Sequence, residues 1–174
     1  MTSIASDQIY AFLRILSERY PHAARLTLLG GSALCLLGSD RPTLDIDYVG
    51  DDLRKTDFQH LIEQVAQELQ IALEAVPIEQ FVPIPAGADE RRLFIGRFHQ
   101  LDVYVLDPYT IALSKLDRGF DTDLEDVAFL IRRGIVAADE LEQVVSDAAT
   151  LAQEFAMDAA ALHVHLATVQ GMVQ

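Results

Sequence analysis

The stretches LTLLGGSA, residues 26–33, and LDIDYV, residues 44–49, decide the fold of this chain. In the first stretch an apolar run ends at two glycines, which predicts a short buried strand and a tight turn. Residues 32–37 then predict a short helix that ends at Gly38. The second stretch alternates apolar and polar residues, which is the period of a strand. A strand, a tight turn, a short helix and a second strand therefore form the centre of the predicted fold.

The rest of the chain is predicted to add helices and further strands around this centre. Apolar residues at steps of three and four predict the helices, and capping residues mark where three of them begin. The predicted helices span residues 6–20, 56–69, 122–133, 138–155 and 157–171, and a further one begins at Pro108. The capping pairs are Thr56–Gln59, Asp107–Pro108 and Thr122–Glu125. The predicted strands span residues 71–76, 93–98 and 101–106. This order indicates an α+β or α/β domain with a helical C-terminal part.

Length and charge narrow the class of protein. The chain has 174 residues, so we expect a single domain, with a core in residues 1–106 and a helical part in residues 107–174. The net charge of −14 argues against broad, non-specific DNA binding, because phosphate backbones are repelled at long range. The N-terminal residues lack a basic segment followed by an apolar one, and no apolar run is long enough for a bilayer. We expect a soluble cytoplasmic protein without a membrane partner.

Asp45 and Asp47 are the first candidates for chemistry. They are two residues apart on a predicted strand, so both side chains point to the same face, while Ile46 and Tyr48 point to the other. Two adjacent anions repel each other unless a cation lies between them, and Mg²⁺ prefers one or two carboxylates together with phosphate oxygens. The alternative is a solvated edge strand with two ordinary surface aspartates.

The turn Gly30-Gly31-Ser32 makes a cation site more specific. Glycine lets backbone amides approach a phosphate closely, and the start of a helix offers further N–H donors. By itself such a turn is also compatible with a simple strand-to-helix connection in which Ser32 caps the helix. Followed at short range by Asp-x-Asp on a strand, it favours a site for phosphates and a hard cation.

The combination of residues 29–33 with Asp45-Ile46-Asp47 resembles the signature of the nucleotidyltransferase superfamily with the DNA polymerase beta fold. Residues 107–126 are similar to small bacterial nucleotidyltransferases, among them the toxins of type IV abortive-infection systems. The resemblance covers about residues 26–130. It implies an α+β fold, in which helices flank a mixed β-sheet and a helical part follows.

The resemblance also implies roles for residues of the core. Gly30, Gly31 and Ser32 would hold the triphosphate of a nucleotide. Asp45 and Asp47 would bind metal, and Asp102, on a later strand, would be the third carboxylate of a site for two Mg²⁺ ions. These three aspartates are the expected catalytic residues. For Asp102 the alternative is a polar residue on the solvent face of its strand.

In the helical part, the resemblance associates Lys115 and Arg118 with the nucleotide's phosphates. Asp123 and Asp126 would orient these two cations. The alternatives are a surface pair between Lys115 and a nearby aspartate, and acids that offset the dipole at a helix start.

We therefore expect a magnesium-dependent enzyme that transfers a nucleotidyl group from a nucleoside triphosphate to an acceptor hydroxyl. The acceptor class stays open between an RNA such as tRNA, a protein and a small molecule. A toxin with an antitoxin partner is one form of this expectation. The alternatives are an inactive member that acts as a binding or regulatory module, and a purely structural domain in which Gly30-Gly31 is only a turn.

Overall fold

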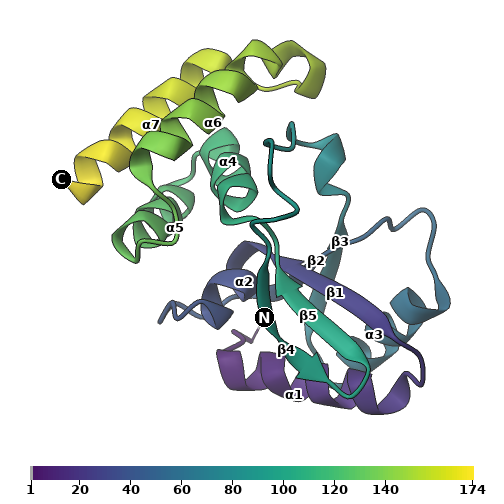
Figure 1. The fold of residues 1–174 in the computed structure, drawn as a ribbon. Coiled ribbons are helices and arrows are strands. Elements are labelled where there is room, and N and C mark those ends of the chain that lie inside the picture. The colour runs from purple at the N-terminus through teal and green to yellow at the C-terminus, as the bar shows by residue number, and fades with distance from the viewer. Residues whose placement is uncertain (1) are drawn as a thin grey trace. The chain divides into compact units, whose positions relative to one another are not determined.

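Two compact units make up the chain in the computed structural model, which describes residues 2–174. The first, called here the sheet unit, comprises the described residues up to Pro77 together with Leu93–Leu106. The second, called the helical unit, comprises Ile78–Arg92 and Asp107–Gln174. Figure 1 shows the fold with the chain coloured by residue number, from purple at the N-terminus to yellow at the C-terminus.

A five-stranded mixed sheet is the frame of the sheet unit. Its strands are β1 (Ala24–Leu29), β2 (Asp45–Val49), β3 (Ala72–Val76), β4 (Leu93–Phe98) and β5 (Leu101–Val105), in the spatial order β3-β2-β1-β5-β4. The central strand β1 runs antiparallel to β2 and parallel to β5. The pair β2–β3 is parallel, and β4–β5 is an antiparallel hairpin.

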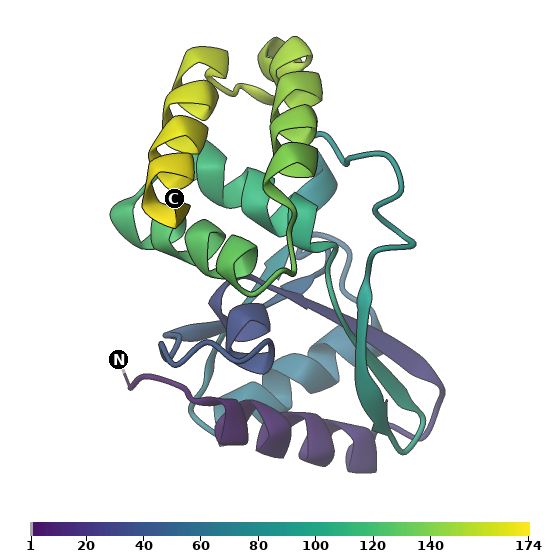
Figure 2. The same cartoon turned by 60° about the vertical axis from the view of Figure 1, so that its left-hand side comes forward.

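Three helices cover one face of this sheet: α1 (Ser6–Arg19), α2 (Gly30–Leu36) and α3 (Asp57–Glu68). Figure 2 shows α1 and α3 along the same side of the strands. Alternate strand residues face the helices, so the core is built from buried side chains such as Leu28, Ile46 and Val103. The ring of Tyr48 also points this way, and its hydroxyl accepts a hydrogen bond from Gln59 of α3. The opposite set of side chains, including both predicted aspartates, therefore lies on the other face.

The helical unit is built from α4 (Pro108–Arg118), α5 (Asp121–Arg132), α6 (Ala138–Thr150) and α7 (Ala159–Val173), with short 3₁₀ turns at Ile78–Gln80 and Ala152–Phe155. Helix α7 packs against each of the other three helices. Leu116, Leu130 and Leu162 are among the fully buried side chains that fill the space between them. No helix in residues 2–174 is both long enough and apolar enough to cross a membrane.

The predicted α+β class, with a mixed sheet, flanking helices and a helical C-terminal part, is confirmed. The Thr56–Gln59 capping box forms at the start of α3, and the Asp107 carboxylate caps α4 with Pro108 in its first turn. The Thr122 cap is wrong: α5 begins one residue earlier, at Asp121, and the residue before it provides no side-chain cap. The helix expected over residues 138–155 ends at Thr150, and a 3₁₀ turn follows.

Candidate functional site

Asp45, Asp47 and Glu74 form a carboxylate cluster on the face of the sheet that the three helices leave open. Asp45 and Asp47 are alternate residues of β2, and the parallel register of β2 with β3 sets Glu74 directly opposite Asp47. One carboxylate oxygen from each residue lies within 4.8 Å of the others. The two aspartates are half-buried and Glu74 is exposed. Three anions this close repel one another, so the arrangement favours a bound cation.

The predicted glycine turn lies against this cluster. Gly30 is the first residue of α2 and has a φ of +64°, a conformation that glycine adopts without strain. A side-chain carbon at this position would overlap the carboxylate of Asp47. The antiparallel register of Leu29 with Asp47 produces this close approach, because it sets the end of β1 beside the middle of β2. Glycine at position 30 is therefore what lets the Asp47 carboxylate occupy its place.

Gly31 and Ser32 are engaged with the protein itself. A side chain at Gly31 would overlap Thr43, so this glycine allows the chain before β2 to pack closely. The Ser32 hydroxyl is fully buried and donates to the carbonyl oxygens of Leu29, at 2.9 Å, and Asp47, at 3.4 Å. The Ser32 side chain thus links the end of β1 to β2. Contact of this turn with a triphosphate stays a prediction. The backbone N–H groups of the turn would make this contact.

Asp102, which was expected to be the third carboxylate, does not lie beside Asp47. Strand β1 lies between β2 and β5, and Asp102 is in register with Arg25, four residues before Leu29 on β1. Its carboxylate accepts two hydrogen bonds from the Arg97 guanidinium, at 2.6 and 3.0 Å. These bonds hold the pKa of Asp102 below its ordinary value.

Glu74 is the carboxylate that sequence reasoning missed. It lies in a predicted strand, residues 71–76, between apolar neighbours. This pattern indicates an acidic side chain on one face of that strand. The missing information was that this strand pairs with residues 45–49 in parallel, and in a register that sets position 74 against position 47.

Lys115 and Arg118 meet both of the acids that were expected to orient them. The Lys115 ammonium lies 2.8 Å from a carboxylate oxygen of Asp126 and 3.5 Å from one of Asp123. Arg118 donates to the same oxygen of Asp123. The Lys115 side chain is 5% exposed, so the structure uses its charge to join α4 to α5 within the helical unit. A contact between these cations and phosphates stays a prediction.

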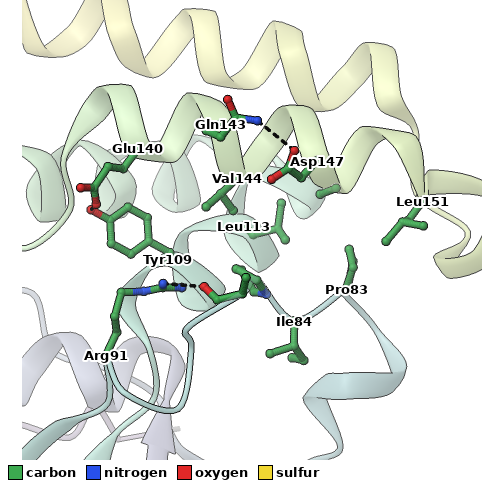
Figure 3. A pocket seen from close by; sticks show the side chains of 13 residues that line it. Pro83, Ile84, Arg91, Tyr109, Leu113, Glu140, Gln143, Val144, Asp147 and Leu151 are labelled. Atoms are coloured by element: carbon green, nitrogen blue, oxygen red, sulfur yellow. Dashed lines mark hydrogen bonds between the residues drawn. The ribbon is translucent and has the colours of Figure 1, made fainter.

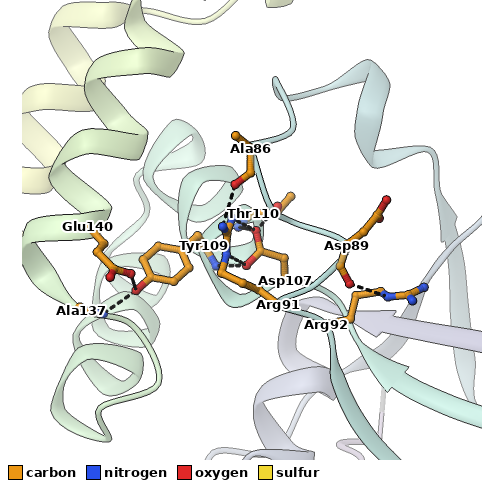
Figure 4. Close-up of polar contacts among 9 residues, drawn as sticks. All are labelled: Ala86, Asp89, Arg91, Arg92, Asp107, Tyr109, Thr110, Ala137 and Glu140. Atoms are coloured by element: carbon orange, nitrogen blue, oxygen red, sulfur yellow. Dashed lines mark hydrogen bonds and ion pairs between the residues drawn. The ribbon is translucent and has the colours of Figure 1, made fainter.

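The helical unit has a second ionic group, in which the partly exposed Arg91 pairs with the buried Asp107 (Figure 4). Asp107 is completely buried, yet its carboxylate accepts five hydrogen bonds from Arg91, Thr110 and the backbone of Tyr109. The Arg91 guanidinium also lies over the Tyr109 ring, 4.9 Å from its centroid. Its role in the structure is to hold the segment before β4 against the start of α4.

Beside this pair lies a cavity of about 550 Å³ between residues 83–86 and α6 (Figure 3). Its wall is largely apolar, with Leu113, Val144 and Leu151 on the helical side. At one end the Tyr109 hydroxyl donates to Glu140 at 2.6 Å, and burial raises the pKa of Tyr109 above its ordinary value. Glu140 and Arg91 are thus held by partners at the edge of the cavity.

We predict that Gly30→Ala weakens Mg²⁺ binding more than its effect on folding explains. The matched control is Gly134→Ala, because Gly134 also has a positive φ, +70°, but nothing lies within 4 Å of an added carbon. Both changes should cost about 1–2 kcal/mol of unfolding free energy through the left-handed backbone. Only Gly30→Ala should displace the Asp47 carboxylate. Titration calorimetry with Mg²⁺ checks this, and equal affinity in the two variants would contradict it.

We also predict that Lys115→Met lowers the unfolding free energy by about 3 kcal/mol, because it leaves Asp123 and Asp126 buried without their lysine. The control is Lys55→Met, at the other lysine of the chain, whose partners Asp52 and Glu63 are at the surface. Its effect should be small, because water screens exposed ion pairs. Urea denaturation of both variants measures the two losses, and a loss in Lys115→Met no larger than that in Lys55→Met would contradict the prediction.

Residues 7–167 match a protein family described as "Nucleotidyltransferase of unknown function (DUF6036)". No curated protein and no solved structure matches the chain.

Proposed function

The chain belongs to this family of nucleotidyltransferases of unknown function, and on that premise we propose that it transfers a nucleotidyl group from a nucleoside triphosphate to an acceptor hydroxyl with the help of magnesium. The observation that carries the proposal is the carboxylate cluster of Asp45, Asp47 and Glu74. It lies on the open face of the sheet, directly against the glycine turn.

The donor set fits magnesium. All three groups are carboxylates, and Mg²⁺ is a hard cation that takes oxygen ligands and commonly combines protein carboxylates with substrate phosphates. When bound, magnesium would neutralise charge on the phosphates and stabilise the attacking and leaving oxygens, and a pair of ions does both. Asp45, Asp47 and Glu74 would hold the metal, and this assignment replaces Asp102 by Glu74 as the third carboxylate.

The other residues of the site hold the carboxylates and the glycine turn in place. Gly30 leaves room for the Asp47 carboxylate, and the buried Ser32 hydroxyl fixes the turn through the carbonyl groups of Leu29 and Asp47. In the proposed reaction the acceptor oxygen forms a bond to the α-phosphorus of the triphosphate. The bond from this phosphorus to the bridging oxygen breaks, pyrophosphate leaves with the electron pair, and the hydroxyl proton is released to water. Such chemistry depends mainly on positioning and charge stabilisation.

The alternative of an inactive binding module predicts an incomplete or blocked set of acids. Three carboxylates that converge within 4.8 Å support an enzyme instead. The toxin role and the antitoxin partner stay predictions. Growth arrest on induced expression, abolished by Asp45→Asn with Asp47→Asn, is the result expected of a toxin that acts through this cluster.

The test of the proposed site compares Glu74→Gln with Asp102→Asn. We expect Glu74→Gln to weaken binding of Mg²⁺ with nucleoside triphosphates at least about tenfold and to slow transfer at least about a hundredfold, because a metal ligand is lost. Asp102→Asn should leave the affinity for Mg²⁺ and nucleotide unchanged, because Asp102 pairs with Arg97 instead of with the cluster.

Calorimetry with each of the four nucleoside triphosphates, with Mg²⁺ and with EDTA, gives the affinities. An α-labelled triphosphate reports transfer. A wild-type protein that binds no triphosphate in the presence of Mg²⁺ would refute the proposed function. A loss of affinity in Asp102→Asn with none in Glu74→Gln would refute the assignment of the third carboxylate.

A further inference from the structure

The open face of the sheet also carries two aromatic rings and an arginine, outside the carboxylate cluster. Phe94 on β4 and Tyr104 on β5 are in register, and their rings meet edge to face with centroids 5.4 Å apart. The Arg25 guanidinium of β1 lies 5.1 Å from the centroid of the Tyr104 ring. We call Arg25, Phe94 and Tyr104 the stacking platform.

The platform is accessible and contributes little to the core. Phe94 is 56% exposed, Arg25 is exposed and Tyr104 is half-buried. The buried side chains of the same strands, such as Leu28 and Val103, point to the helical face instead. An exposed aromatic pair beside a cation is therefore a surface on which a ligand could bind.

Strand register places the platform and the carboxylate cluster on the same sheet face. Tyr104 is in register with Thr27, and Asp47 with Leu29, two residues further along β1. Side chains in register share a face, and Thr27 and Leu29 are alternate residues of one strand. The separation is two strand spacings across and two residues along, or about 12 Å between Asp47 and Tyr104.

The chemistry of the platform matches nucleic-acid bases. Aromatic rings stack on base faces whatever the base, and arginine adds cation–π contact and pairs with phosphate. In this register row Arg25 and Arg97 are cations and Asp102 is an anion, so these three side chains together carry a charge of +1 although the chain carries −14. The overall charge limits contact to a short stretch, and stacking requires bases that are not paired in a duplex.

We propose that the stacking platform binds unpaired bases near the end of a single-stranded nucleic acid, and that the terminal hydroxyl of this strand is the acceptor at the carboxylate cluster. The proposal rests on the proposed function and names its acceptor class. The terminal oxygen forms the new bond to the α-phosphorus, and pyrophosphate leaves as before. The distance of about 12 Å lets one strand engage both places, with its end at the cluster and preceding bases on the rings.

The experiment measures binding of fluorescein-labelled hexanucleotides, as oligo-rA and oligo-dA, by fluorescence anisotropy in EDTA. Wild type is compared with Tyr104→Leu, Phe94→Leu and Arg25→Gln. Loss of one stacked base should weaken binding about tenfold. Tyr104→Phe keeps the ring and should bind as wild type. Phe120→Leu is the control for an exposed phenylalanine outside the platform, in the helical unit, and should also bind as wild type.

Two further measurements distinguish binding by base stacking from binding by charge, and binding from catalysis. With only one or two phosphates contacted, the logarithm of the affinity should fall with the logarithm of salt concentration with a slope of about −1. Asp45→Asn with Asp47→Asn should bind the hexanucleotides undiminished and transfer nothing to them, because the cluster and the platform are separate. Circular dichroism and thermal unfolding verify that each variant is folded.

The outcomes distinguish this proposal from the function it rests on. If wild type binds nucleoside triphosphate with Mg²⁺ but neither hexanucleotide, the acceptor is of another class, such as a protein, and the platform proposal is wrong. Equal hexanucleotide binding by wild type and Tyr104→Leu would also overturn it. Binding that depends on the rings, without any magnesium-dependent affinity for triphosphate, would support the platform and refute the proposed function.

Discussion

The site depends on how closely the Asp47 carboxylate approaches the backbone of Gly30. There is no room for a side chain at position 30, and the backbone there has a positive φ. This contact joins the end of β1, the start of α2 and the middle of β2, so it defines the register of the antiparallel pair. A slip of one residue would turn Asp45 and Asp47 to the helical face and bury them where Ile46 and Tyr48 now pack. The register of β1 with β2 therefore determines both where the carboxylates lie and which side chains of β2 fill the core.

Local patterns predicted the parts of the site that depend on one segment. The alternation in residues 44–49 placed Asp45 and Asp47 on one face, because the period of a strand is a local property. The third carboxylate could not be chosen in this way. Asp102 and Glu74 both stand on strands between apolar residues, and only the order β3-β2-β1-β5-β4 distinguishes them. That order follows from packing across the whole sheet, and no single stretch of sequence contains it.

The helical unit shows the same division between local and distant information. The spacing of Asp123 and Asp126 placed both on one face of a helix, and they do meet Lys115. The burial of this group follows from how α4, α5 and α7 pack, which the spacing alone does not reveal. The contact of Arg91 depends even more on residues distant in the sequence. Its partner Asp107 was recognised as a helix cap, but the pair joins positions 16 residues apart with the whole β4–β5 hairpin between them.

The Arg91–Asp107 pair closes a loop in the path of the chain. The polypeptide leaves the sheet unit after Pro77, returns at Leu93 and leaves again after Leu106, so the units are interleaved in sequence. Truncation at one point cannot yield both units whole: a fragment that ends at residue 106 would carry Arg91 without the carboxylate that holds it. The helical unit likewise cannot be transplanted as a contiguous cassette, because residues 78–92 belong to it.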